Sequence, residues 1–128
     1  MTGRFEVGAV AVFEAFHLIP GADGPEGKLH PHRYRMEVTA DRPGLDERGM
    51  VVDLEAFLPA VKSLAADLHG KDLAFIQPPD AESVTVEVLS KWAHAALAPL
   101  ARGQGAETLS VRVWESDEAY GGYSAGVR

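Results

Sequence analysis

Hydrophobic and polar residues alternate along the first forty residues of the chain, as they do in β-strands with one buried face. Between about residues 4 and 18, apolar side chains occupy every second position. A second alternating run covers about residues 30–40 and places Tyr34, Met36 and Val38 on one face. Because successive side chains of a strand point to opposite faces, each run predicts a half-buried strand. The Gly/Pro-rich segment 20–27 lies between the runs and predicts that the two strands pair antiparallel.

The spacing of apolar residues changes to a helical period in the middle of the chain. Asp53 is the expected N-cap of a first helix, whose apolar positions are Leu54, Phe57, Leu58, Val61, Leu64, Ala65 and Leu68. Pro59 lies inside this run, so we expect the helix either to start later or to kink there. A second helix is predicted from about Ala81 to Leu97, with Asp80 as its cap.

Three further extended segments complete the pattern. Residues 49–52 form a short extended piece before the first helix, and alternation over 109–116 and 118–127 predicts two C-terminal strands. The order ββααββ indicates an α+β fold, with an antiparallel four-stranded sheet and two helices on one face. At 128 residues with 46% apolar content, we expect one domain over residues 1–128.

Composition excludes several classes of function. The formal charge of −7 argues against nucleic acid or an anionic membrane as the main partner. The chain has no cysteine, so it has neither disulfides nor a thiol nucleophile. No apolar run reaches transmembrane length and no signal-peptide pattern is present, so a cytoplasmic protein is the default expectation.

Three histidines carry the main chemical signal. His30 and His32 stand two apart at the start of the second strand, so both imidazoles point to its apolar face. His17 ends the apolar face of the first strand, just before the connecting loop. Imidazoles converging where two strands meet predict a zinc site with an open fourth position, although such pairs also occur by chance at strand ends.

Glu115 and His94 are weaker signals. Glu115 continues the inward face of Leu109, Val111 and Val113, which places a carboxylate at the end of an apolar surface. A buried carboxylate needs a partner, and this one is either a ligand-binding group or a strand-end glutamate in water. His94, on the second helix, is expected to be an ordinary surface residue.

Five short motifs in order resemble the 6-pyruvoyltetrahydropterin synthase and 6-carboxytetrahydropterin synthase family. Residues 13–17 (Phe-Glu-Ala-Phe-His) resemble its first zinc-ligand strand, and residues 29–34 (Leu-His-Pro-His-Arg-Tyr) resemble its Leu-His-Gly-His-x-Tyr motif. Residues 49–54 and 79–82 resemble the starts of its two helices. Residues 113–116 resemble its Val-x-Glu-Thr strand end, whose glutamate anchors the pterin ring.

The resemblance implies a tunnelling fold (T-fold), in which three subunits join their sheets into a barrel and two trimers stack into a homohexamer. It implies Zn²⁺ held by His17, His30 and His32, and a pterin-like substrate of the dihydroneopterin type bound by Glu115. The implied activity is that of a zinc-dependent lyase acting on the pterin side chain, in pterin pathways such as queuosine biosynthesis.

Two departures from the family pattern concern proton transfer. Glu26 stands where the synthases usually carry a cysteine, and it is a candidate general base or a solvated loop residue. His69 is displaced by one position from the family's catalytic histidine, and it is either a second candidate or a helix C-terminal residue. The alternative function is therefore a divergent zinc-binding homologue that does other chemistry on a different heterocycle, or only binds it.

Overall fold

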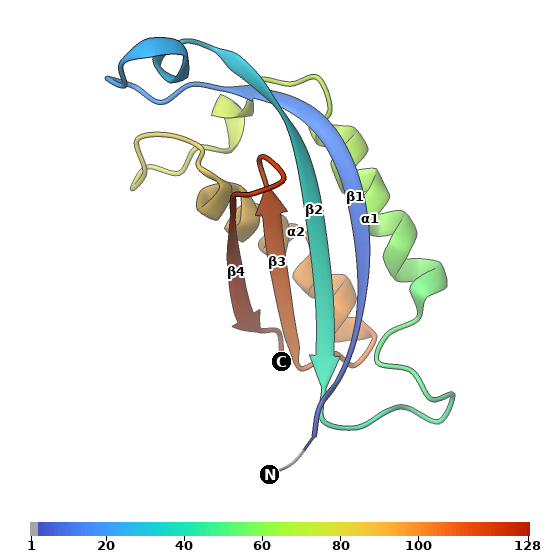
Figure 1. The fold of residues 1–128 in the computed structure, drawn as a ribbon. Coiled ribbons are helices and arrows are strands. Elements are labelled where there is room, and N and C mark those ends of the chain that lie inside the picture. The colour runs from blue at the N-terminus through green and yellow to red at the C-terminus, as the bar shows by residue number, and fades with distance from the viewer. Residues whose placement is uncertain (1–2) are drawn as a thin grey trace.

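The computed structural model describes residues 3–128, which form an antiparallel four-stranded sheet with two α-helices on one face (Figure 1). The strands are β1 (Phe5–His17), β2 (His30–Arg42), β3 (Thr108–Trp114) and β4 (Tyr120–Gly126). The helices are α1 (Leu54–Leu68) and α2 (Val86–Gly103), and two short 3₁₀ helices are η1 (Gly24–Gly27) and η2 (Leu73–Ile76). The predicted α+β class and strand pairing are confirmed.

The sheet runs in the order β1-β2-β3-β4, and its first two strands extend beyond the other two (Figure 1). β1 and β2 pair along their whole length, so that His17 faces His30 and Ala15 faces His32. β3 stops at Trp114, opposite Arg35. The end of the β1–β2 hairpin that carries the histidines therefore has no neighbour from β3.

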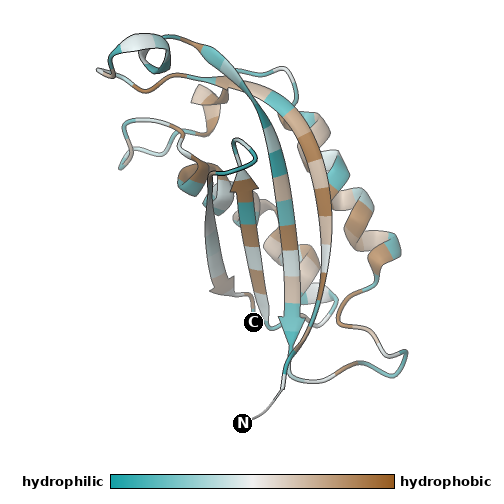
Figure 2. Ribbon diagram, in the orientation of Figure 1, coloured by the Kyte–Doolittle hydropathy of each residue, from teal (hydrophilic) through white to brown (hydrophobic). Residues whose placement is uncertain are grey.

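The core lies between the sheet and the two helices. Figure 2 shows the alternation of hydrophobic and hydrophilic positions along β1 and β2. The inward residues of the strands meet the apolar stripes of the helices, and the largest fully buried side chains are Tyr34, Phe13, Phe57, Met36, Leu68, Leu73, Leu89 and Leu109. This burial supplies the main driving force that holds the layers together.

Helix α1 begins where its cap predicts and continues through its proline. The Asp53 carboxylate accepts a hydrogen bond from the Glu55 backbone N–H at 2.9 Å, which fixes the first turn. The expectation of a later start is therefore wrong. Pro59 removes one intrahelical donor, and the carbonyl left unpaired belongs to exposed Glu55, where water can bind it.

Helix α2 starts five residues later than predicted. Thr85 is its cap and accepts a hydrogen bond from the Val88 backbone N–H at 3.2 Å, whereas Asp80 lies in a turn. The helix also runs past Leu97 to Gly103, through Pro99. Residues 81–85 remain free of the helix, and this leaves the Val84 carbonyl available to the site described below.

Two smaller expectations also need correction. Residues 49–52 form bends and do not pair with a strand, but Val51 and Val52 are buried under the sheet. His94 is buried at 7% exposure, because α2 packs against β4 and places its ring against Tyr123.

No helix within residues 3–128 is both long and apolar enough to cross a membrane.

Candidate metal centre

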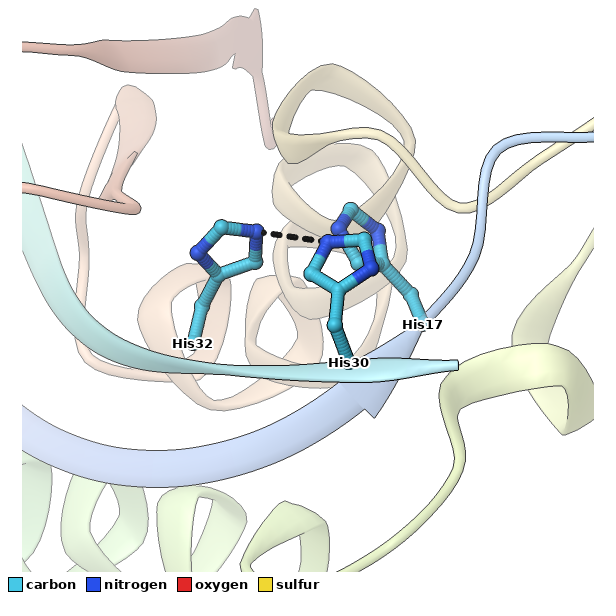
Figure 3. A group of neighbouring side chains, drawn as sticks. All are labelled: His17, His30 and His32. Atoms are coloured by element: carbon cyan, nitrogen blue, oxygen red, sulfur yellow. Dashed lines mark hydrogen bonds between the residues drawn. The ribbon is translucent and has the colours of Figure 1, made fainter. Parts of the chain in front are cut away.

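Three imidazoles converge at the loop end of the β1–β2 hairpin (Figure 3). One ring nitrogen from each of His17, His30 and His32 lies within 4.8 Å of the other two. The Nε2 atoms of His30 and His32 are 3.0 Å apart. The cross-strand register explains the cluster, because His17 faces His30 directly and His32 lies two residues further along the same face.

Two backbone carbonyls orient two of these rings. The Nδ1–H of His17 donates to the Val84 carbonyl at 2.8 Å, and the Nδ1–H of His30 donates to the Lys28 carbonyl at 2.7 Å. With Nδ1 protonated, each ring presents the lone pair of Nε2 toward the cluster. Metal-binding histidines are held in this way, with the second nitrogen donating to a carbonyl or carboxylate.

The donor set fits a zinc ion. Within residues 3–128, the Nε2 of His17 is buried and has no hydrogen-bond partner, a costly state that a metal bond would remove. Zn–N bonds of about 2.0–2.1 Å at tetrahedral angles separate ligand nitrogens by about 3.4 Å, close to the 3.0 Å between His30 and His32. Burial, followed by the neighbouring His17, lowers the pKa of His32 and so favours the neutral form that binds metal.

The proline of the His-Pro-His segment is tolerated because of its place in the sheet. Phe16 of β1 faces Pro31, and the Phe16 N–H donates to the Lys71 carbonyl on the outer edge of β1, at 2.8 Å. Phe16 and Pro31 therefore form a non-hydrogen-bonded pair, and the nitrogen of Pro31 points away from β1. No strand among the described residues lies on that side, so the missing N–H removes no ladder bond.

Tyr34 and Glu115 continue the site along β2. Tyr34 is 1% exposed, and its ring centroid is 5.6 Å from that of His32. Continuing the β2–β3 register by one residue places half-buried Glu115 opposite Tyr34, just beyond the end of β3. Burial, and then the charge of Glu115, raise the pKa of the Tyr34 phenol, so it stays protonated and can donate a hydrogen bond.

The two acid–base candidates have different positions. Glu26 is exposed in η1. The negative charges of Glu115 and Glu26 act on His32 and partly oppose the lowering of its pKa. His69 is the C-cap of α1, and its Nδ1 accepts a hydrogen bond from the Glu14 backbone N–H at 3.1 Å, on the outer edge of β1. Among the described residues, the cluster of ligand atoms contains His17, His30 and His32 and leaves His69 out.

Sequence reasoning missed the carbonyls of Lys28 and Val84. Every residue type carries a backbone carbonyl, so no residue pattern could have identified them. A cavity of about 210 Å³ lies beside His17, and its wall includes Leu18, Gln77 and Val84. The loop before α2 thus helps to form both the wall of the cavity and the support for a ligand.

Comparison with known proteins places these features in a family. The family model described as 6-pyruvoyl tetrahydropterin synthase matches residues 6–125. A search of curated proteins found no significant match.

Several solved structures share the fold at low sequence identity. The Plasmodium vivax 6-pyruvoyltetrahydropterin synthase, as a glutamate-to-alanine variant described as a catalytic-residue mutant, superposes with a TM-score of 0.76 at 13% identity, covering 97% of this chain and 99% of that one. The Caenorhabditis elegans 6-pyruvoyl tetrahydropterin synthase gives 0.75 at 15% identity, covering 98% of each chain. The sheet and helices thus match the T-fold, and the chain belongs to the 6-pyruvoyl tetrahydropterin synthase family, whose members are lyases.

Proposed function

We propose that this protein is a zinc-dependent lyase that acts on the side chain of a dihydroneopterin-type pterin. The observation that carries the proposal is the cluster of His17, His30 and His32, with two rings already oriented by backbone carbonyls. A lyase of this family needs a group that binds side-chain oxygens, a group that fixes the ring and a group that moves protons. The described residues offer a candidate for each.

The three histidines would hold Zn²⁺ through their Nε2 atoms. When bound, the metal supplies Lewis acidity that polarises a side-chain hydroxyl or carbonyl oxygen. The chain's own part is to keep the rings neutral and correctly turned, which the carbonyls of Val84 and Lys28 support.

Glu115 is the proposed anchor for the pterin ring. The amino and ring N–H groups on one edge of a pterin match the two oxygens of a carboxylate, which can accept two charge-assisted hydrogen bonds. His32 and Tyr34 are two residues apart on β2, a rise of about 6.6–6.8 Å, and Glu115 lies across from Tyr34. This separation accommodates a pterin whose bicyclic ring binds Glu115 and whose own side chain extends toward the histidines.

Glu26 is the proposed proton-transfer group, and His69 is its competitor. The Glu26 carboxylate acts electrostatically on His32, whereas His69 lies on the edge of β1 in the single chain. A carboxylate accepts a proton from a reacting C–H or O–H group once the substrate is held within reach. The Plasmodium vivax structure is described as a mutant of a catalytic glutamate. A carboxylate in a catalytic role in a protein of the same fold supports the choice of Glu26.

The proposed assembly is a homohexamer of two stacked trimers. β1 and β4 are the outer strands of the described sheet, so each presents an edge. Part of the β1 edge, at Glu14 and Phe16, is covered by the segment after α1. Joining the remaining edges of three copies into a closed barrel removes edges that otherwise promote aggregation.

A product assay tests the proposed function. The zinc-loaded protein is incubated with dihydroneopterin triphosphate, and the products are separated and identified by mass. Conversion to a pterin with an altered or shortened side chain supports the proposal. If pterin fluorescence shows binding but no product forms, the result favours a binding protein. The absence of both binding and turnover would contradict the pterin assignment.

A further inference from the structure

The loop between the first two metal-site strands is a compact turn that connects His17 to His30. The Ile19 N–H donates to the Glu26 carbonyl at 2.8 Å, and the Ala22 N–H donates to the Ile19 carbonyl at 3.2 Å. These bonds fold the loop back on itself only two residues after His17. The loop therefore adopts a defined shape with its own hydrogen bonds.

Gly27 lies where the two sides of this turn are in close contact. A Cβ built on Gly27 would overlap the carbonyl oxygen of Ala22, which is backbone and cannot rotate away. The φ angle of Gly27 lies outside the left-handed region, so the requirement for glycine is steric and not conformational. Any side chain here forces residues 22 and 27 apart.

The residue after Gly27 holds a metal ligand. The Lys28 carbonyl accepts the hydrogen bond from His30 Nδ1–H at 2.7 Å, and the Lys28 N–H is bound to the Pro25 carbonyl at 3.2 Å. A displacement of Gly27 therefore moves the backbone of Lys28, including the carbonyl that binds His30. His17 is supported by Val84 from a different loop, so its ring stays in place.

We infer that Gly27 is a positioning residue for the metal site, because its contact with Ala22 places the Lys28 carbonyl on His30. The turn thereby selects the Nδ1–H tautomer of His30 and presents its Nε2 to the metal. Glu26 lies in the same turn, so the same contact also sets the position of the proposed proton-transfer group. This inference rests on the proposed zinc site and adds a residue that no ligand motif contains.

The test compares Gly27→Ala with Gly44→Ala. Gly44 lies in an exposed turn, has no atom within 4 Å of a built Cβ and has no positive φ, so it is a matched control for replacing a loop glycine. Zinc affinity is measured by competition with a chromophoric chelator. The tautomer of each histidine is read from ¹⁵N chemical shifts of the imidazole rings in the apo-protein.

Loss of an outer-shell partner weakens metal binding by about 10–100-fold, and this is the effect expected for Gly27→Ala and not for Gly44→Ala. His30 should lose its fixed Nδ1–H tautomer while His17 keeps it. Wild-type affinity and an unchanged His30 tautomer in Gly27→Ala would overturn the inference and leave the zinc proposal intact. Equal disturbance of His17 and His30 would also overturn it, because the effect would then be general unfolding. A wild-type protein that binds no zinc would overturn both.

Discussion

Replacing His30 with alanine tests the metal centre through its effect on thermal stability. A ligand that binds only the folded state stabilises it by RT ln(1 + [L]/Kd), which is about 2.7 kcal/mol when free zinc is 100 times Kd. For a domain of 128 residues, 1 kcal/mol corresponds to about 3–5 °C in Tm. Zinc at this concentration should therefore raise the Tm of the wild-type protein by about 8–14 °C.

The His30→Ala variant should lose nearly all of this shift. Structural zinc sites with four ligands contribute about 12 kcal/mol, so one ligand accounts for about 3 kcal/mol, or more than a hundredfold in affinity. At the same zinc concentration the variant is then at most half saturated, which leaves about 0.4 kcal/mol of stabilisation. The apo-protein should also lose some stability, because His30 is half-buried and its replacement removes two hydrogen bonds, to the Lys28 carbonyl and to His32, each worth about 0.5–1.5 kcal/mol.

The assay is thermal unfolding of wild type, His30→Ala and His69→Ala, each with a chelator and with zinc. His69→Ala is the matched control, since it removes an imidazole that lies outside the cluster. The control should keep the zinc-dependent shift in full. If zinc raises the Tm of His30→Ala as much as that of the wild-type protein, zinc binds elsewhere. If zinc does not raise the Tm of the wild-type protein, the metal centre itself is refuted.

Three further outcomes are expected. Glu26→Gln should reduce turnover by about two to four orders of magnitude while zinc stays bound, as measured by steady-state kinetics and metal analysis; unchanged turnover in this variant, with loss in His69→Ala, would reverse the roles. Glu115→Gln should weaken pterin binding by about 10–150-fold, corresponding to loss of about 1.5–3 kcal/mol of charge-assisted hydrogen bonding, and fluorescence titration that finds wild-type affinity would remove Glu115 from the site. Light scattering should report the mass of six 13.7 kDa chains, and a monomer at micromolar concentration would count against edge-to-edge closure.

Periodicity along the chain was sufficient to predict the strands and the convergence of three histidines. Side chains of a strand alternate between two faces, so the shared parity of His30, His32 and Tyr34 is a property of the local sequence alone. The Gly/Pro-rich loop between the first two strands made antiparallel pairing the expected arrangement, and this pairing brought His17 opposite His30. Asp53 similarly marked the start of α1, because capping depends on neighbours within one turn.

Only the tertiary structure decided which groups support the site. The Val84 carbonyl reaches His17 because Thr85, and not Asp80, is the cap of α2. The position of this helix start depends on how the preceding segment packs, because both residues are suitable caps. His69 sits on the edge of β1 because the chain after α1 pairs there with Glu14. Such contacts join residues 55 and 67 positions apart, and in each of them an imidazole binds a backbone group of a kind that every sequence possesses. Local pattern therefore determined which side chains could bind the metal, and long-range packing determined which atoms hold them in place.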